Sequence, residues 1–238
     1  MSRRPPVPSL LRRRALITGA ASGIGRATAL TAARRGAELH LTDLDATGLA
    51  ETTRLVEAEG GTVLTSAPLD ITDHDGVLAL AAEVHAAHGS VDVVMNVAGV
   101  STWGTIDRLT HEDWEKMIDV DLRGPISVLE AFVPPMIEAG RGGHVVNVSS
   151  AAGLLGLPWD AAYSAAKFGL RGVSEVLRFD LRRHRIGVSL VGPRDRYLVF
   201  TSADIRVAFL AQRYFPPAYE LGMRRLNAHL TAVARSAS

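Results

Sequence analysis

The sequence predicts an α/β fold in which a doubly wound parallel sheet carries helices on both faces. Short β-type runs alternate with helical patterns along most of the chain, and parallel strands need such crossover helices. A glycine-rich turn joins the first of these runs to the first helix. The 238 residues are 47% hydrophobic and 21% charged, which is the composition of a globular protein that buries a sizeable core.

The strands and helices follow one another in regular order, without a sequence repeat. The expected strands are Ala15–Thr18, Glu38–Thr42, Thr62–Ser66, Val91–Asn96, His144–Ser149 and Ile186–Val191. The expected helices lie near residues 24–35, 46–59, 74–88, 110–139 and 160–184.

Two of these helices carry further signals. Thr110 and Asp113 have the spacing of a capping box, which predicts the start of the fourth helix. Pro134 and Pro135 are expected to kink or break that helix toward its end. The last helix has a predicted buried stripe, which consists of Leu170, Val173, Leu177 and Leu181.

The glycine-rich turn has the pattern G-x-x-x-G-x-G, made by Gly19, Gly23 and Gly25, with Ser22 and Ile24 between them. Glycine lets the backbone turn tightly and lets a pyrophosphate approach closely. The helix that opens near Gly25 offers free N–H groups and its positive dipole end. The turn therefore indicates a dinucleotide site, although three glycines alone also fit an ordinary turn.

A second group of residues can move a proton. Tyr163 and Lys167 are four residues apart and share one helix face. An ammonium beside a phenol favours the phenolate, so the pKa of Tyr163 is expected below the usual ~10. Ser150, which stands 13 residues before the tyrosine, can hold the substrate oxygen. This set indicates alcohol–ketone redox chemistry, with a cofactor carrying the hydride.

The segments TGAASGIG, NVAG, VNVSS and YSAAK occur in the order and spacing of the short-chain dehydrogenase/reductase family, which the chain resembles from Ala15 to about Val191. The resemblance implies a Rossmann-like fold and an NAD-dependent oxidoreductase that interconverts a secondary alcohol and a ketone. It gives Ser150, Tyr163 and Lys167 catalytic roles.

The fourth catalytic residue implied by the resemblance is Asp121. It stands where the family usually has an asparagine that helps to hold a water in the proton relay. Asp121 keeps that role if its backbone carbonyl is what matters, and it could instead add a charge that alters the pKa values of the relay.

The resemblance assigns the cofactor to the glycine turn, to Tyr163 and Lys167, and to a few residues at strand ends. Asp43 can accept both hydroxyls of the adenosine ribose and would repel a 2′-phosphate, which favours NAD over NADP. No basic residue follows at Leu44, which also favours NAD. The remaining expected contacts are Asp70, Ile71, Asn96 and Gly99.

Several of these residues have a second interpretation. Asp43 could cap the following helix, although Asp45 could fill that role equally well. Asp70 could be an ordinary loop aspartate. Ser149 competes with Ser150 for the catalytic role, and the family spacing favours Ser150.

Histidines and aromatic residues give weaker signals. His85 and His88 are three residues apart, and a solvated helix face is favoured over a metal site because no third ligand is evident. Four loop residues could line an apolar substrate pocket or could belong to the core: Trp103, Leu155, Leu157 and Trp159.

The chain departs from the family after Val191. Only Gly192–Arg196, five residues, separate the sixth strand from the next strand-like run, Tyr197–Phe200. A parallel neighbour needs a crossover of about a dozen residues. We therefore expect the substrate-lid region to be missing, Tyr197–Phe200 not to be a full parallel neighbour of the sixth strand, and one sheet face to be partly bare.

Residues 1–10 are expected to be a disordered lead-in and residues 11–238 a single Rossmann-like NAD-binding and catalytic domain. The net charge of +1 gives no case for a nucleic-acid partner, and no apolar run is long enough for a membrane span. The N-terminus lacks a secretory core, so the expected location is cytoplasmic. The absence of cysteine excludes disulfides and thiolate metal sites.

The expected partner is a small-molecule alcohol or ketone, with family-like homo-oligomers as a further expectation that the missing segment weakens. The alternative to an active enzyme is an NAD(H)-binding but catalytically impaired, shortened paralogue.

Overall fold

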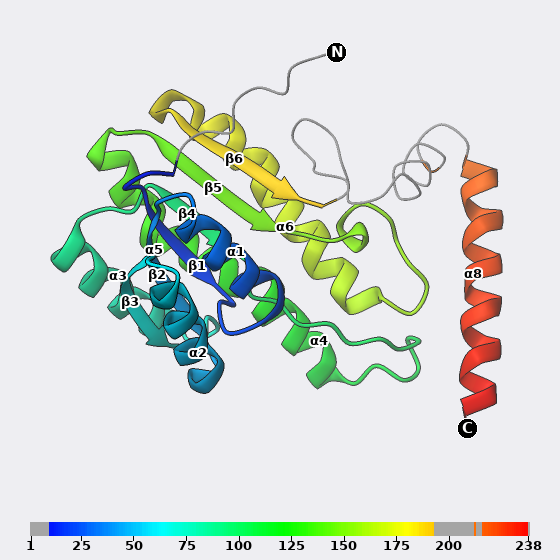
Figure 1. Ribbon diagram of the computed structural model, residues 1–238. Helices are drawn as coiled ribbons and strands as arrows, with labels where there is room; N and C mark the ends of the chain where they lie inside the picture. Colours follow the sequence, from blue (N-terminus) through cyan, green and yellow to red (C-terminus); the bar gives the residue numbers. More distant parts are fainter. Residues whose placement is uncertain (1–9, 193–211, 213–215, 238) are drawn as a thin grey trace, which may run out of the picture. The chain divides into compact units, whose positions relative to one another are not determined.

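The computed structural model describes residues 10–192, 212 and 216–237 (Figure 1). The chain divides into two compact units. Unit 1 is the chain up to Ala98 with Ser127–Val145 and His184–Ile186, and unit 2 is Gly99–Ile126, Val146–Arg183 and the chain from Gly187 onward. One six-stranded parallel sheet has the order β3-β2-β1-β4-β5-β6, which confirms the predicted doubly wound, Rossmann-like fold. The single-domain assignment stays a prediction.

The strands lie where the sequence places them, with ends shifted by a few residues. Strand β1 (Arg14–Thr18) pairs in parallel with both β2 (Glu38–Asp43) and β4 (Val93–Asn96), and β2 pairs with β3 (Thr62–Pro68). Strand β5 is Gly143–Val148, and β6 is Ile186–Val191, as predicted. Placing the first strand beside the fourth brings the ends of β1 and β4 together.

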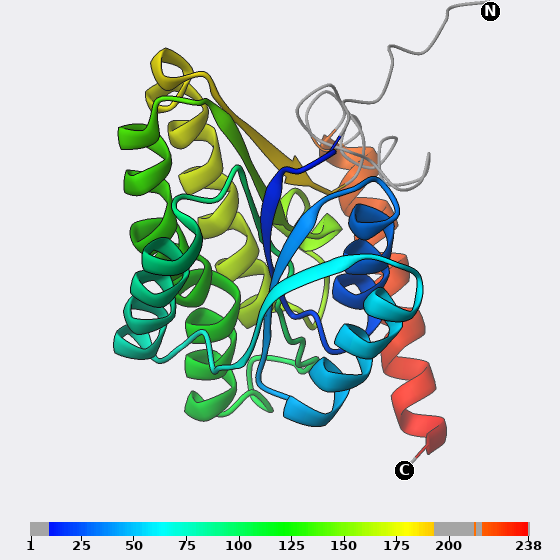
Figure 2. The same cartoon turned by 60° about the vertical axis from the view of Figure 1, so that its left-hand side comes forward.

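In unit 1, helices lie on both faces of the sheet (Figure 2). Helices α1 (Gly23–Ala33) and α2 (Ala46–Ala58) lie on one side, and α3 (His74–His88) lies on the other. The core between α1, α2 and the sheet is built largely from alanine and leucine, with Ala15, Ala29 and Leu39 among its fully buried members. Small side chains let α1 approach the sheet closely, which positions the glycine turn at its start.

The predicted helix over residues 110–139 is three segments. Helix α4 (His111–Ile118) begins at the capping box of Thr110 and Asp113, as predicted. A π-helical turn (Asp119–Arg123) then leads into α5 (Gly124–Ala139). Helix α5 continues through Pro134 and Pro135, so the expectation that they break it is wrong. The irregularity lies instead at the π-turn, a geometry that often marks functional sites.

In unit 2, helix α6 (Ala161–Asp180) covers one face of the last two strands, and Asn147 on β5 donates a hydrogen bond to Ser174 on α6. Leu170 and Leu181 of the predicted stripe are buried, whereas Val173 and Leu177 are half-buried. Alternate residues of β6 are buried, and those between them, which face away from α6, are only half-buried. Helix α8 is Pro216–Ala237. The Tyr197–Phe200 run lies outside the described residues.

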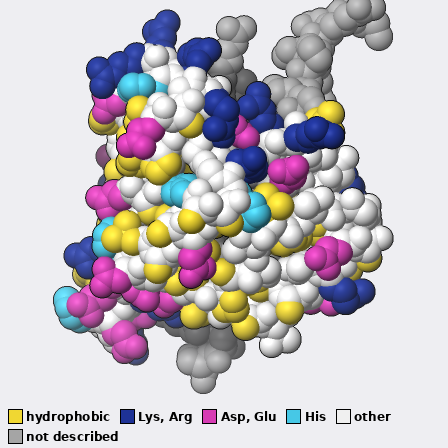
Figure 3. Space-filling model, turned by 90° about the vertical axis from the view of Figure 1, so that its left-hand side faces the viewer, with side chains coloured by type: hydrophobic (Ala, Val, Ile, Leu, Met, Phe, Trp, Pro, Cys, Tyr) yellow, Lys and Arg dark blue, Asp and Glu magenta, His cyan; other side chains and the backbone are white. Residues whose placement is uncertain are grey.

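Arginine side chains gather in the upper part of the face shown in Figure 3. A hollow of about 480 Å³ in unit 1 is lined by Arg12, Arg13, Arg14 and Arg141 with Asp92 and Leu11. Arg14 donates to the carbonyl of His88 in the last turn of α3, and Arg141 donates to the carbonyl of Ser90. Cations at a helix C-terminus satisfy free carbonyls and complement the dipole. These arginines therefore close helix ends and neutralise the buried carboxylate.

No helix in the described part of the chain is long and apolar enough to cross a membrane.

Candidate active site

The glycine turn in unit 1 is locked against the NVAG segment. Gly19 has a φ of +69°, and a Cβ there would lie 2.7 Å from the backbone of Ala98. The hydroxyl of Thr18 accepts hydrogen bonds from the amides of Val97 and Ala98, at 3.0 and 3.1 Å. Sequence reasoning missed this role of Thr18, which ties the ends of β1 and β4 together.

The start of α1 fits a pyrophosphate. A Cβ on Gly25 would overlap the carbonyl oxygen of Gly19, so only glycine lets the helix lie so close to the turn. Ser22 is the N-cap of α1 but makes no side-chain capping bond. The first-turn N–H groups can therefore serve an anion. Gly23, with φ of +49°, supplies the left-handed conformation at the first turn.

Asp43 lies at the end of β2 and braces the glycine turn. One carboxylate oxygen accepts from the amide of Ala21 at 2.9 Å, and the other accepts from the amide of Asp45 at 2.9 Å. The cap of α2 is Asp45, which accepts from the amides of Thr47 and Gly48. The helix-capping role considered for Asp43 therefore belongs to Asp45. Each oxygen of Asp43 keeps a lone pair for a ribose hydroxyl.

Arg26 is a basic residue beside the turn whose position the sequence reasoning missed. It donates to Thr52 through Nε at 2.9 Å and to the carbonyls of Ala21 and Gly48 through Nη2. The signal was the arginine directly after the third glycine. Because these acceptors fix its guanidinium, Arg26 holds the turn against α2.

Three other predicted cofactor residues lie in unit 1. Asp70 is exposed and accepts from both the amide and the hydroxyl of Thr72, which forms a local turn. Ile71 is buried, and Asn96 at the end of β4 is buried. The exposed turn at Asp70 and Thr72 is compatible with both interpretations of Asp70: a contact with the adenine and an ordinary loop aspartate.

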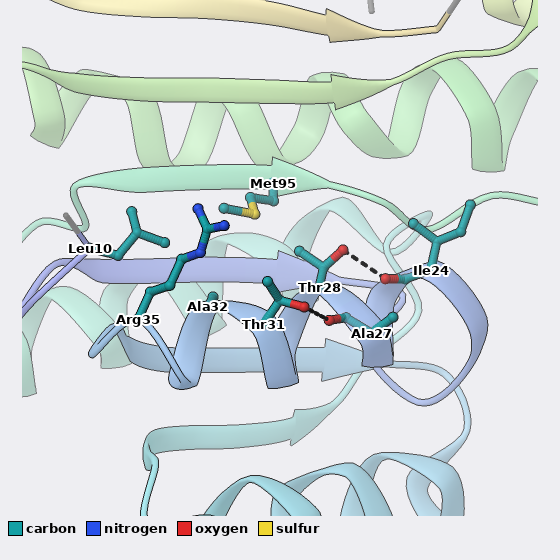
Figure 4. Close-up of a pocket in the computed structure, with 8 residues that line it drawn as sticks. All are labelled: Leu10, Ile24, Ala27, Thr28, Thr31, Ala32, Arg35 and Met95. Carbon is teal, nitrogen blue, oxygen red and sulfur yellow. Dashed lines mark hydrogen bonds between the residues drawn. The ribbon is translucent and has the colours of Figure 1, made fainter. Parts of the chain in front are cut away.

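Ile24 lies at one end of a hollow of about 420 Å³ along α1 (Figure 4). Thr28 and Thr31 line it too, and their hydroxyls donate to the carbonyls of Ile24 and Ala27 in their own helix. Because these hydroxyls are engaged, the threonines present mainly their methyl groups. The hollow therefore holds no catalytic set, and Ile24 is 65% exposed.

The centre of unit 2 is a buried ion pair. Lys167 donates through Nζ to Asp121 Oδ1 at 2.9 Å and to the carbonyl of Val148 at 3.2 Å. Asp121 lies in the π-turn and is fully buried, and its Oδ1 also accepts from the amide of Val100. A Cβ on Gly99 would lie 2.6 Å from this oxygen, so glycine there makes room for the pair.

Tyr163 lies beside this pair, with Lys167 Nζ 5.5 Å from its ring centroid. Burial raises the pKa of Tyr163 above its ordinary value, the negative charges of Asp121 and Asp160 raise it further, and a hydrogen bond from Ser150 lowers it. The expected lowering of this pKa by Lys167 is therefore wrong for the protein alone. Lys167 is paired with Asp121, whose charge offsets its own.

Ser150 and Ser149 point to different places. Ser150 caps the short 3-10 helix Ala151–Gly153, accepts from the amide of Ala152 and lies close enough to Tyr163 to lower its pKa. The Ser149 hydroxyl is buried, and a Cβ on Gly153 would lie close to it. Of the two hydroxyls, the one that reaches Tyr163 is that of Ser150.

Asp160 is a functional candidate that sequence reasoning missed. It is 1% exposed, stands at the N-cap of α6 without making a capping bond, and its Oδ1 has no hydrogen-bond partner among the described residues. Burial and then the charge of Asp121 raise its pKa to about 6. The signal was an aspartate three residues before the tyrosine, which ordinarily indicates a helix cap.

Three of the four apolar residues that were expected in a pocket or in the core lie in the loop before Asp160, and the fourth, Trp103, lies between β4 and α4. Leu155 is buried, so it belongs to the core, whereas Leu157 and Trp159 are half-buried and Trp103 is exposed. Trp159 has a φ of +68°, and its indole N–H donates to Asn227 on α8 at 2.9 Å. The left-handed backbone of Trp159 is strained, and it forms the turn directly before the buried Asp160.

The histidines of α3 do not lie on a solvated face. The ring of His85 contacts the edge of Phe132, and the ring of His88 lies 5.3 Å from that of His40 on β2. The expectation of a solvated face is therefore wrong, because His85 packs against Phe132 on α5 and His88 packs against His40 on β2. No group of three metal-ligating side chains occurs among the residues that the structure describes.

The family model for short chain dehydrogenases matches residues 13–196 of this chain. The chain belongs to the short-chain dehydrogenase/reductase family. Its similar relatives include SadH of Mycobacterium tuberculosis (strain ATCC 25618 / H37Rv), which is named as an oxidoreductase. The two are 45% identical over 181 residues, which cover 75% of this chain and 65% of SadH. The chain thus spans less than two thirds of the length of this relative.

Two solved structures of the family are similar to this one. A short-chain dehydrogenase from Mycobacterium paratuberculosis bound to NAD has a TM-score of 0.74 and 33% identity, over 78% of this chain and 73% of that chain. A short-chain oxidoreductase from a metagenome in complex with NADP has a TM-score of 0.73 and 39% identity, over 79% and 84% of the two chains. Similar members of the family therefore bind either dinucleotide.

Proposed function

We propose that this short-chain dehydrogenase/reductase interconverts a secondary alcohol and a ketone with NAD(H). The observation that carries the proposal is the cluster in unit 2, where Ser150 lies close enough to Tyr163 to lower its pKa and Lys167 Nζ lies 5.5 Å from the centroid of the Tyr163 ring. A hydroxyl, a phenol and an ammonium in one half-buried place are the groups that carbonyl redox chemistry needs.

The residues divide the work. A bound nicotinamide supplies or accepts the hydride. Tyr163 exchanges a proton with the substrate oxygen, and Ser150 holds that oxygen by a hydrogen bond. Lys167 holds the ribose of the nicotinamide, and Asp121 fixes the position of Lys167. The substrate is a small-molecule alcohol or ketone.

NAD rather than NADP is supported by Asp43. Its carboxylate lies at the end of β2 beside the glycine turn, where a 2′-phosphate would meet a negative charge. Arg26, the nearby cation, is engaged by the carbonyls of Ala21 and Gly48. These two features together favour a ribose with a free 2′-hydroxyl.

A second candidate is a protein that binds NAD(H) but turns over slowly or not at all. It is favoured by the raised pKa of Tyr163 and by the pairing of Lys167 with Asp121. A phenol that keeps its proton at neutral pH is a poorer base for alcohol oxidation than a phenolate, and a lysine that is paired with a carboxylate stabilises the phenolate less than an unpaired one.

The test is NADH oxidation against a panel of ketones, measured in parallel with NADH binding by fluorescence. Turnover of a ketone that Tyr163→Phe abolishes, with NADH affinity retained, supports the enzyme. Tyr219→Phe is the matched control, because Tyr219 on α8 donates to the carbonyl of Gly156 rather than to the cluster. Binding of NADH without turnover of any ketone would support the second candidate, and absence of binding would contradict both.

A further inference from the structure

The cluster around Tyr163 holds more negative than positive charge. Among the described residues of this cluster, two buried carboxyls, Asp121 and Asp160, accompany a single buried cation, Lys167. Lys167 and Asp121 form an ion pair at 2.9 Å, in which the positive charge of the lysine balances the negative charge of Asp121. Asp160 is left over as a buried carboxyl with an unpartnered oxygen in the described structure.

Within the described part of the chain, the elements packed around the cluster offer Asp160 no cation. The π-turn contributes Asp121, and the loop after β5 contributes Ser150. Helix α4 packs against α6 and buries the apolar Met117, while its Lys116 and Glu115 are exposed. The hydrogen bonds between α8 and the loop before α6 join neutral groups, from Trp159 to Asn227 and from Tyr219 to the carbonyl of Gly156.

Asp160 and Tyr163 both lie at the N-terminal end of α6. Asp160 is the N-cap residue of α6 and Tyr163 is the third residue of that helix, and the side chain of an N-cap residue lies near this third position. A phenolate formed at Tyr163 would lie beside the charge of Asp160 in a place that water screens poorly. An ionised Asp160 therefore opposes the loss of the Tyr163 proton.

We propose that Asp160 is a positioning residue whose negative charge keeps Tyr163 protonated, and that it thereby moves the onset of alcohol oxidation to higher pH. This inference rests on the proposed function for its effect on catalysis, but its first part concerns Tyr163 alone. In oxidation, the alcohol O–H bond breaks and the proton goes to the Tyr163 phenolate, while the alcohol carbon gives up a hydride to the oxidised nicotinamide. The product is the ketone, and Tyr163 returns its proton to solvent.

The pKa of Asp160, raised to about 6, is consistent with this role. At neutral pH the carboxyl is mostly ionised, and it is then that its charge acts on Tyr163. Below about pH 6 it becomes neutral, and its effect on Tyr163 is lost.

The first experiment needs no cofactor and no substrate. Tyrosine ionisation is followed by ultraviolet difference absorbance as the pH is raised, and Tyr163→Phe identifies the share of the signal that belongs to Tyr163. In Asp160→Asn the Tyr163 midpoint should fall by about one pH unit. Asp180→Asn removes the same charge from an exposed position in the same helix and should leave the midpoint unchanged.

The second experiment is the pH profile of alcohol oxidation with the full chain. Asp160→Asn should move the onset of alcohol oxidation to lower pH by about one unit, the same shift as in the Tyr163 midpoint. Asp160→Glu, which keeps the charge, should restore the wild-type profile.

The outcomes separate the inference from the proposed function. An unchanged Tyr163 midpoint in folded Asp160→Asn overturns the inference, whatever the activity. A shifted midpoint without turnover in any variant supports the role of Asp160 toward Tyr163 and overturns the proposed function. If Asp160→Asn does not fold, the same comparison is made with Asp160→Ser, and an unchanged midpoint there has the same meaning.

Discussion

Lys167 Nζ lies 2.9 Å from Asp121 Oδ1, and both side chains are almost completely buried. The lysine that the YSAAK segment supplies is therefore neutralised by a carboxylate from a different part of the chain. Burial raises the pKa of Asp121, and the charge of Lys167 opposes that rise. The pair decides how much of the lysine's charge reaches Tyr163.

Asp121→Asn should release that charge. With the carboxylate gone, one cause of the raised pKa of Tyr163 disappears and Lys167 acts on the phenol, so this pKa falls and alcohol oxidation begins at lower pH. The amide still accepts from Lys167 but leaves its charge unbalanced, which should cost about 1–3 kcal/mol of unfolding free energy. Asp119→Asn, in the same π-turn but paired with the exposed Arg123, should change neither quantity. If alcohol oxidation by Asp121→Asn has the same pH dependence as the wild type, Asp121 does not control the pKa of Tyr163.

Asp43 should decide the choice of cofactor. We expect NADH to bind at least ~10-fold more tightly than NADPH, which corresponds to about 1.4 kcal/mol, and Asp43→Asn to remove most of this preference. Asp45→Asn, at the α2 cap, should lower stability slightly and leave the preference intact. Fluorescence titration with both dinucleotides measures this. Equal affinities in the wild type would refute the role given to Asp43.

Two glycines provide a contrast between close approach and free space. Gly25→Ala should weaken NADH binding strongly and lower the melting temperature, because its Cβ would overlap the carbonyl of Gly19. Gly172→Ala in α6 meets nothing within 4 Å and should raise the unfolding free energy by about 0.5–1 kcal/mol without altering binding. Calorimetry with and without NADH distinguishes the two. Normal binding in Gly25→Ala would argue against a pyrophosphate at this turn.

His40 should make the fold sensitive to acid. Burial, and then the charges of His88, Arg14 and His85, lower its pKa from 6.5 to about 4. The unfolded chain takes up this proton below about pH 6.5 and the folded chain does not, so stability is complete above pH 6.5 and is lost as the pH falls toward 4. The loss should reach about 3 kcal/mol in urea unfolding.

His40→Gln carries no charge at any pH and should flatten this dependence. His111→Gln, on the exposed start of α4, is the control and should behave like the wild type. The same slope in His40→Gln as in the wild type would show that another group causes the acid sensitivity.

Helix α6 presents an exposed apolar stripe, and we propose that the chain associates with itself through it. Phe168, Val176 and Phe179 are 40%, 59% and 74% exposed and recur at helical spacing. Phe168→Glu with Phe179→Glu should shift the protein to a smaller species in analytical ultracentrifugation. Leu78→Glu, on α3 and 42% exposed, should not. An already monomeric wild type removes the proposal.

The sequence was sufficient to predict the alternation of strands and helices, the glycine turn and the capping box at Thr110. These features depend on local patterns: apolar spacing, glycine positions and a side chain three residues from its partner. The break predicted at Pro134 and Pro135 does not occur, since helix α5 continues through both prolines. The π-turn that actually interrupts the helix has no local sequence signal of comparable strength.

The YSAAK and VNVSS segments were sufficient to predict Ser150, Tyr163 and Lys167 as candidate site residues, because chemistry of this kind needs particular side chains at fixed spacing. Only the tertiary structure decided which charges surround these side chains and how they shift the pKa of Tyr163. It brought Asp121 onto Lys167, buried Asp160 beside Tyr163, and so turned the expected low pKa of the phenol into a raised one. The physical reason is that spacing along a helix fixes direction, whereas electrostatic energy depends on burial and on every charge within a few ångströms, most of which come from distant parts of the chain.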